Sequence, residues 1–192
     1  MINLKIDPEF QSQIPPLTDD EFKQLEKNIL KEGKLLSPLI VWGNTLVDGH
    51  NRYAILQKHP EICFSTMPLR FANREEALAW ICKNQLGRRN LSPEQKRYLL
   101  GKQYESEKKA EKIFHGNQYT LAKKSGGSHD DTHHSGKKTC NRIAEENGVS
   151  RASVLRARHY TKGVDIADTD IPSPRKTAIL FNRMTSSSEN TL

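Results

Sequence analysis

The chain has 192 residues, 35% of them hydrophobic, and 30 Lys and Arg against 23 Asp and Glu give it a formal net charge of +7. Its mean hydropathy of −0.74 predicts that part of the chain lies outside any packed core. No apolar run reaches the roughly 18 residues of a membrane helix, and residues 1–7 lack the apolar stretch of a signal peptide. The three cysteines form no CxxC pair, which argues against a disulfide framework and a zinc finger. We therefore expect a cytoplasmic protein without membrane attachment.

The positive charge is concentrated in one part of the chain. Residues 1–82 carry a net charge of −2, whereas residues 83–192 carry +9. Such an asymmetry indicates a polyanionic partner for the basic part. A solvated basic surface without a partner would give the same distribution of net charge.

The first half of the chain reads as alternating helices and strands. The capping-box pair Thr18 and Glu21 precedes apolar residues at helical spacing and predicts a helix over 18–32 that stops at Gly33. The apolar runs on both sides of Gly43 predict a strand hairpin. The expected elements are strands over 39–42 and 45–48, a helix over 52–58, a strand near 67–71 and a helix from 73 to about 81.

The second half predicts helices separated by polar segments. Ser92 as N-cap and Pro93 at the first helical position start a connecting helix over 92–114. Residues 115–138 are rich in Gly, Ser and Lys without apolar periodicity, which predicts a flexible linker. Its histidines match no closed zinc motif, so we expect no metal site there. The expected division is 1–91 for the first domain, then 92–114, 115–138, an ordered segment over 139–165 and a mostly disordered tail over 166–192.

Residues 140–158 have the pattern of a helix-turn-helix. Ala144 is small where two helices cross, Gly148 suits a turn that needs positive φ, and Ser150 can cap the second helix. Val149 is expected to pack under the turn, and Val154 and Ala157 to face inward. A helical hairpin in a protein-binding module would have the same core pattern.

The second helix of this motif is rich in arginine, which favours DNA binding over the protein-binding alternative. Such a helix enters the major groove with its N-terminal residues against base edges, where arginine reads guanine or clamps phosphate. The candidate DNA-binding residues are Arg142, Ser150, Arg151, Ser153, Arg156, Arg158 and His159. Double-stranded DNA is therefore the expected partner.

The stretch 47–54 is the most specific pattern of the first domain. A strand ends at Asp48, Gly49 opens a turn, and a helix follows with polar and basic residues. The backbone N–H groups at such a helix start form an anion site, and Arg52 could hold a phosphate bidentately. Asp48 is a candidate ligand for a metal or a ribose hydroxyl. A hydrogen-bonded structural turn would have the same sequence.

In context, the chain resembles the ParB side of the ParB/sulfiredoxin superfamily, and most closely ParB N-terminal-domain proteins of phages and mobile elements. The resemblance runs from about residue 5 to residue 161. It rests on a helix ending in Glu32-Gly33, on 36–41, on Gly49-His50-Asn51-Arg52, on the stretch 84–94 with its Leu-Ser-Pro-Glu segment, and on the helix-turn-helix. It implies an α+β fold, in which a small mixed sheet with helices is followed by an all-α helix-turn-helix segment and a flexible tail.

The resemblance also implies a nucleotide site. ParB proteins bind CTP and Mg²⁺ between a Gly-Glu-Arg-Arg turn and a Glu-Asn-x-x-Arg box. Carried over by position, the site residues are Gly49, His50, Asn51, Arg52, Asn84, Gln85 and Arg88. The carboxylates of both motifs are replaced here, by His50 and Asn84, and Mg²⁺ prefers anionic oxygen ligands. Asp48 is a possible substitute ligand. The expectation is therefore a site for CTP or another nucleoside triphosphate.

The expected function is that of a DNA-binding ParB-like protein, active in plasmid or mobile-element partition or in its regulation. The resemblance implies a ParA-type ATPase and a second copy of the chain as possible partners, and a location on the nucleoid or plasmid. One alternative is a nucleotide-dependent phosphotransferase or nuclease with Asp48 or His50 as general base. Sulfiredoxin activity is not expected, because His50 stands where those enzymes place their cysteine. A protein-interaction adaptor is the third hypothesis.

Overall fold

A computed structural model describes residues 3–88, 91–119 and 132–167 of the chain. These residues divide into two compact units, one up to Phe71 and one from Ala72 onward, which we call unit 1 and unit 2. The division falls before the predicted domain end at residue 91, because the helix over 74–86 groups with the helices that follow it. Within the described ranges, no helix combines the length and apolar character needed to cross a membrane.

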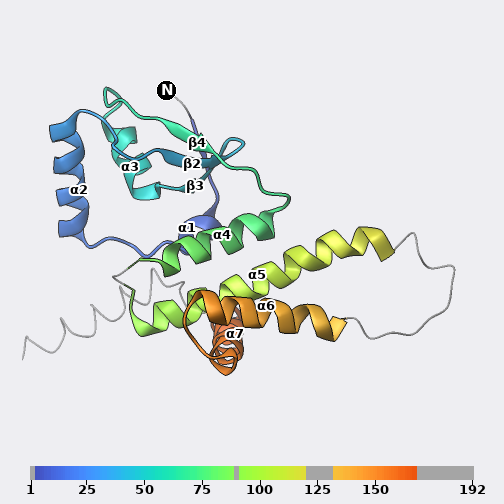
Figure 1. The fold of residues 1–192 in the computed structure, drawn as a ribbon. Coiled ribbons are helices and arrows are strands. Elements are labelled where there is room, and N and C mark those ends of the chain that lie inside the picture. The colour runs from blue at the N-terminus through green and yellow to red at the C-terminus, as the bar shows by residue number, and fades with distance from the viewer. Residues whose placement is uncertain (1–2, 89–90, 120–131, 168–192) are drawn as a thin grey trace, which may run out of the picture. The chain divides into compact units, whose positions relative to one another are not determined.

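Unit 1 holds a four-stranded mixed sheet in the order β1-β3-β2-β4 (Figure 1). The strands are β1 Lys5–Ile6, β2 Leu39–Trp42, β3 Thr45–Asp48 and β4 Thr66–Pro68. β2 and β3 form the predicted antiparallel hairpin around Gly43, whose φ is +57°. β1 pairs parallel with β3, and β4 pairs parallel with β2. The mixed sheet confirms the expected α+β fold.

Three helices complete unit 1: α1 Pro8–Ser12, α2 Asp19–Glu32 and α3 His50–Lys58. The Thr18–Glu21 capping box is formed at the start of α2, and Gly33 ends the helix at φ +65°, both as predicted. Ile29 of α2 packs on a core that includes Leu39 of β2, Leu46 of β3 and Ile55 of α3. These contacts fix the junction between β3 and α3, where the predicted anion site lies.

Unit 2 is all helical, with α4 Arg74–Leu86, α5 Pro93–Tyr119, α6 Thr132–Glu146 and α7 Arg151–Ala167. α5 contacts all three of the other helices, and Figure 1 shows α6 and α7 gathered along it. The core contains Leu100 and Tyr104 of α5 together with Ile143 of α6 and Val154 of α7. The α6–α7 pair, where the sequence predicts a helix-turn-helix, is thus packed against α5.

The helices extend further than the sequence pattern predicted. α5 continues to Tyr119 and α6 begins at Thr132, so both ends of the expected linker 115–138 are helical. α7 continues to Ala167, just past the expected end at residue 165. The centre of the linker, 120–131, and the rest of the tail, 168–192, lie outside the described residues.

Candidate nucleic-acid interface and the turn before α3

The turn between α6 and α7 lies where the sequence predicts the turn of a helix-turn-helix. Gly148 adopts φ +62°, and the Val149 N–H donates to the Ala144 carbonyl oxygen at 2.9 Å. The Ser150 hydroxyl accepts from the Ser153 N–H at 3.1 Å, which caps α7. Because only glycine takes a positive φ without strain, Gly148 permits the turn and Ser150 starts the second helix in register.

The inner face of the motif is packed as expected at most positions. Ile143 and Val154 are fully buried, and Ala144 and Ala157 are also buried. Val149 differs, because 38% of its surface is exposed and it does not pack under the turn. The turn is closed by the backbone hydrogen bond of Val149, so its side chain is not needed beneath it.

The start of α7 presents basic residues to solvent. Arg151, Arg156 and His159 are exposed, and Ser153 is half-buried. The Arg156 guanidinium donates to the Ser153 hydroxyl at 3.3 Å. Among the residues that the structure describes, no carboxylate forms an ion pair with Arg151 or Arg156. These two arginines therefore have the exposure and the charge that a polyanion contact requires.

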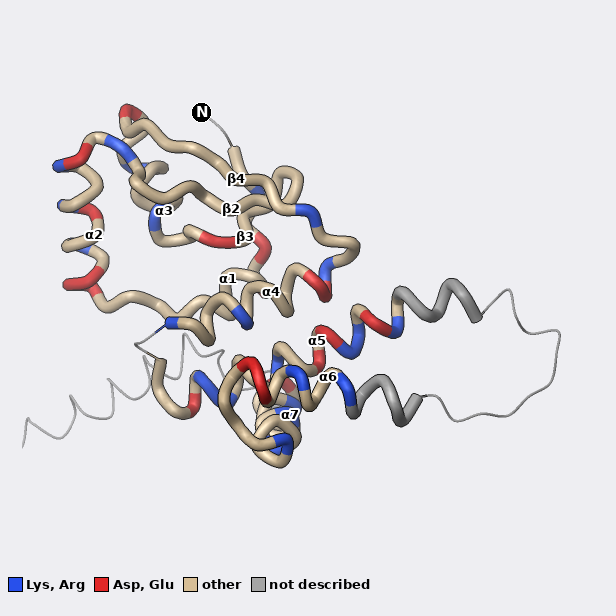
Figure 2. The backbone as a smooth tube through the Cα atoms, viewed as in Figure 1, with Lys and Arg blue, Asp and Glu red and all other residues tan. Residues whose placement is uncertain are grey.

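Two other predicted DNA-binding arginines lie against α5 and are paired there. Arg142 forms ion pairs with Glu107 of α5 and with Glu146, the latter at 2.7 Å. Arg158 pairs with Glu105 of α5. Figure 2 shows the acidic positions of α5 interleaved with basic ones along this helix. Both arginines therefore hold the helices together, which the sequence pattern did not reveal.

Glu107 is the most buried carboxyl of this network. Burial raises the pKa of its carboxyl above the usual range, although hydrogen bonds from Gln103 and Arg142 act in the opposite direction. The Gln103 amide donates to it at 3.0 Å. The α5–α6 contact thus contains a charged group whose desolvation costs free energy and whose partners offset part of that cost.

The turn before α3 is shaped by Gly49. This residue has φ +99°, and a Cβ atom here would lie 2.7 Å from the Leu39 Cδ2 atom. His50 and Asp48 on either side are buried, and Asn51 is half-buried. The glycine therefore allows β3 and α3 to join at close quarters, with the first backbone N–H groups of α3 at the turn.

Arg52 is engaged inside unit 1. Its Nη1 donates to the carbonyl oxygens of Ser37 at 2.7 Å and Pro38 at 3.0 Å, and its Nη2 pairs with Asp48 Oδ2 at 3.1 Å. Three acceptors thus hold one guanidinium, and the Asp48 carboxylate is paired with it. The arrangement matches the structural-turn alternative, because the predicted phosphate clamp and the predicted Mg²⁺ ligand bind each other.

The remaining predicted nucleotide residues lie on and just after α4, in unit 2. Asn84 and Arg88 are exposed, whereas Gln85 is fully buried. Within the described residues, no group of three or more His, Cys, Asp or Glu side chains could hold a metal ion. The predicted nucleotide residues thus belong to both units, and nucleotide binding stays a prediction.

Comparison with known proteins identifies the fold. No protein-family model and no curated protein sequence matches the chain. A solved structure of a pNOB8-like ParB N-domain, in its C2221 form, matches with a TM-score of 0.55 and 21% identity over 80% of this chain and 65% of that chain. A second structure of the pNOB8-like ParB N-domain matches with a TM-score of 0.53 and 22% identity over 80% and 60% of the two chains. The chain has the ParB N-domain fold.

This likeness concerns the fold alone, since the identity is low. The ParB-like chain spans less than two thirds of each solved chain. The alignment covers most of the present chain, however, and so supports the resemblance drawn from the motifs between residues 5 and 161.

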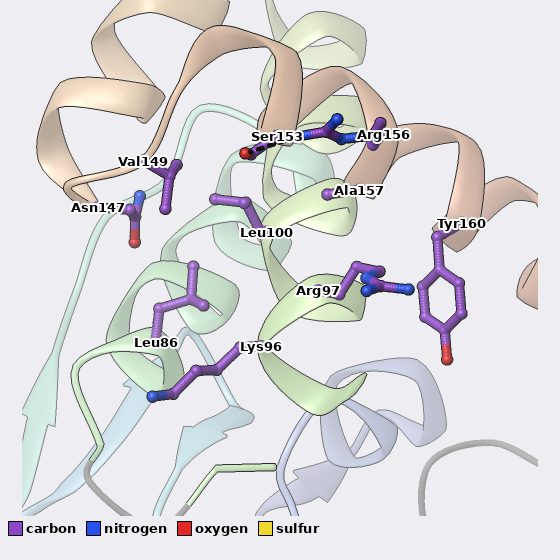
Figure 3. A pocket seen from close by; sticks show the side chains of 10 residues that line it. All are labelled: Leu86, Lys96, Arg97, Leu100, Asn147, Val149, Ser153, Arg156, Ala157 and Tyr160. Atoms are coloured by element: carbon purple, nitrogen blue, oxygen red, sulfur yellow. Dashed lines mark hydrogen bonds between the residues drawn. The ribbon is translucent and has the colours of Figure 1, made fainter. Parts of the chain in front are cut away.

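One feature of the ParB-like unit 2 was missed by sequence reasoning. A cavity of about 590 Å³ lies among α4, α5 and the helix-turn-helix, with Lys96, Arg97, Arg156 and Tyr160 in its lining (Figure 3). The adjacent Lys96 and Arg97 stand near the start of α5, in the stretch 83–112, whose net charge is +5. Two adjacent basic residues in the sequence could have indicated an anion site. They could not reveal which residues of α7 line the same cavity.

Proposed function

We propose that the chain is a DNA-binding ParB-like protein that contacts the duplex through α7 and acts in the partition or regulation of a plasmid or other mobile element. The observation that carries the proposal is the pair Arg151 and Arg156. Both are exposed at the N-terminal half of the second helix of a helix-turn-helix, without a carboxylate partner among the described residues.

The proposed contact follows from the shape of the motif. The second helix of a helix-turn-helix enters the major groove, and its N-terminal side chains approach the base edges and the flanking phosphates. Arginine serves both contacts, since its planar donors match guanine and phosphate oxygens. The net charge of +9 over residues 83–192 supports the same partner. Arg142 and Arg158 are omitted from the proposed contact because Glu107 and Glu105 hold them.

Fluorescence anisotropy with the full chain and a labelled random-sequence duplex tests the proposal. The double variant Arg151→Ala/Arg156→Ala should weaken binding by about tenfold or more, because two charge-assisted contacts are lost. The matched control is Lys112→Ala/Lys138→Ala, which removes the same charge from exposed positions of α5 and α6. Equal affinity of the two double variants, or binding that does not respond to salt, would refute the proposal.

The proposed role in partition rests on the likeness of the fold to the ParB N-domain. A ParA-type ATPase and a second copy of the chain are the proposed protein partners. Co-purification with the ATPase encoded nearest to the gene, and the molar mass of the chain in solution, test the two partners separately. Loss of a test plasmid when Arg151 and Arg156 are replaced would connect DNA binding to partition, whereas stable inheritance would separate them.

Nucleotide hydrolysis and nuclease activity are not part of the proposal. Asp48 and His50, the predicted general bases, are buried, and Asp48 is paired with Arg52. A phosphate-release assay with each nucleoside triphosphate and Mg²⁺ tests this alternative. Release by the wild-type chain that is lost in Asp48→Ala would show that the chain is an enzyme.

A further inference from the structure

The cavity of unit 2 is lined by residues from both sides of the helix-turn-helix. Its volume of about 590 Å³ lies in the range of pockets that hold small organic ligands. Lys96, Arg97 and Leu100 reach it from α5, and Arg156 and Tyr160 from α7 (Figure 3). Val149, whose exposure was unexpected, borders it from the turn. The exposed valine thus belongs to a cavity wall.

The charge of this cavity is of one sign. Among the residues that the structure describes, three cationic side chains line it and no carboxylate does. The Arg97 guanidinium lies 5.2 Å from the centre of the Tyr160 ring, and Arg156 donates to Ser153. Glu94 acts on Arg97 electrostatically from the first turn of α5, but its own carboxylate accepts from Ser92 and does not line the cavity.

Several other cations of unit 2 form ion pairs with carboxylates. Lys83 pairs with Glu146 at 3.1 Å and Lys102 with Asp165 at 3.0 Å. Other cations paired in the same way are Lys109, Arg142, Arg158 and Lys162. Within the described residues, Lys96, Arg97 and Arg156 form no such ion pair. Like charges that share one cavity repel one another, so an anion that entered would relieve that repulsion.

The other walls suit an organic group. Leu86, Leu100 and Ala157 supply apolar surface, and the Tyr160 ring offers a face for stacking. We propose that this cavity binds a phosphate-bearing ligand of nucleotide size, with Lys96, Arg97 and Arg156 on the phosphates and the organic part against the apolar wall. Two sources share this chemistry, a free nucleoside triphosphate and a nucleotide of the DNA backbone. The cavity belongs to unit 2, whereas the turn at Gly49 belongs to unit 1, and no carboxylate among the described residues lines the cavity.

Calorimetry with the full chain, each of the four ribonucleoside triphosphates and EDTA tests the first source. Chelation removes Mg²⁺, so a metal-dependent site cannot contribute to the heat. Two variants address the cavity: Lys96→Ala/Arg97→Ala removes two cations, and Val149→Trp fills the space from an exposed position. The control is again Lys112→Ala/Lys138→Ala. Circular dichroism checks that each variant is folded.

Binding of a triphosphate in EDTA, weakened about tenfold or more in both cavity variants and unchanged in the control, would support the proposal with the free nucleotide as ligand. The second arm repeats the comparison with the labelled duplex. If no triphosphate binds but both cavity variants lower the DNA affinity below that of the control, the ligand is the DNA backbone. If neither variant differs from the control with either ligand, the proposal is wrong. That outcome leaves the role of Arg151 in DNA binding untouched.

Discussion

Gly101 of α5 lies directly against Ala157 of α7: a Cβ atom on Gly101 would be 2.3 Å from the Ala157 carbonyl oxygen. The same atom would lie 2.2 Å from the Thr161 hydroxyl, which itself donates to the Tyr98 carbonyl oxygen at 2.8 Å. Contacts this short do not occur between real atoms, so the two helices can meet here only because Gly101 has no side chain. The position of α7, and with it the proposed DNA-binding face, depends on this contact.

Replacing Gly101 with alanine should therefore destabilise unit 2. Over-packing of this kind costs about 1–3 kcal/mol of unfolding free energy, because backbone as well as side-chain atoms must move. The control is Gly163→Ala on α7, where a Cβ would meet nothing within 4 Å. That change should stabilise the chain by about 0.4–1 kcal/mol, since alanine restricts the unfolded chain. Urea denaturation of both variants measures the difference, and equal effects would contradict the close contact.

Arg52 should act in stability rather than in ligand binding. Arg52→Ala leaves the buried Asp48 carboxylate without its cation and the Ser37 and Pro38 carbonyls without their donor. Hydrogen bonds to charged groups contribute about 1.5–3 kcal/mol, so we expect a loss of that size in the unfolding free energy of unit 1. Arg52→Lys keeps the charge but cannot reach all three acceptors, and should recover only part of it.

The matched control for Arg52 is Arg70→Ala, since Arg70 is an exposed arginine of the same unit. Its replacement should change the stability by less than about 0.5 kcal/mol. If Arg52→Ala and Arg70→Ala changed the unfolding free energy equally, Arg52 would not make the three contacts described above. Its predicted role in binding phosphate would then regain support. Thermal unfolding followed by circular dichroism distinguishes these results.

The features that the sequence predicted well are local ones. The Thr18 capping box, the stop at Gly33, the turn at Gly148 and the cap at Ser150 each involve residues a few positions apart, so the pattern contains both partners. Arg52 was interpreted as a phosphate clamp because its spacing to Gly49 was visible. The sequence pattern did not show that Arg52 would donate to two carbonyl oxygens on the loop that follows α2.

The arginines of the helix-turn-helix illustrate the same limit at longer range. Arg156 and Arg158 look equivalent in the sequence, but the contact of α7 with α5 turns Arg158 toward Glu105 and leaves Arg156 exposed. Which face of α7 meets α5 depends on Gly101, many residues away, and no periodicity reports that contact. The cavity beside Arg156 was missed for the same reason.

The raised pKa of Glu107 predicts that the stability of the chain depends on pH. Burial raises the pKa of its carboxyl in the folded chain, so the folded state binds the proton more tightly than the unfolded state does. The contribution of Glu107 is therefore fully favourable at low pH and declines as pH rises from the ordinary value of 4.5 through the raised one. Relative to Glu107→Gln, the wild-type chain should lose unfolding free energy across this window, as measured by urea denaturation at each pH. A relative gain would mean that the Arg142 pair outweighs burial.

The salt dependence of DNA binding separates the arginines of α7. Each phosphate contact contributes about 0.9 to the slope of log affinity against log salt concentration. Arg151→Ala/Arg156→Ala should therefore lower the slope by about 1 to 2, depending on whether one or both side chains contact phosphate. Arg158→Ala should leave the slope unchanged and lower stability instead, because its guanidinium pairs with Glu105 and lies 5.7 Å from the centre of the Tyr104 ring. An equal loss of slope in Arg158→Ala would place Arg158 in the interface and contradict its pairing with α5.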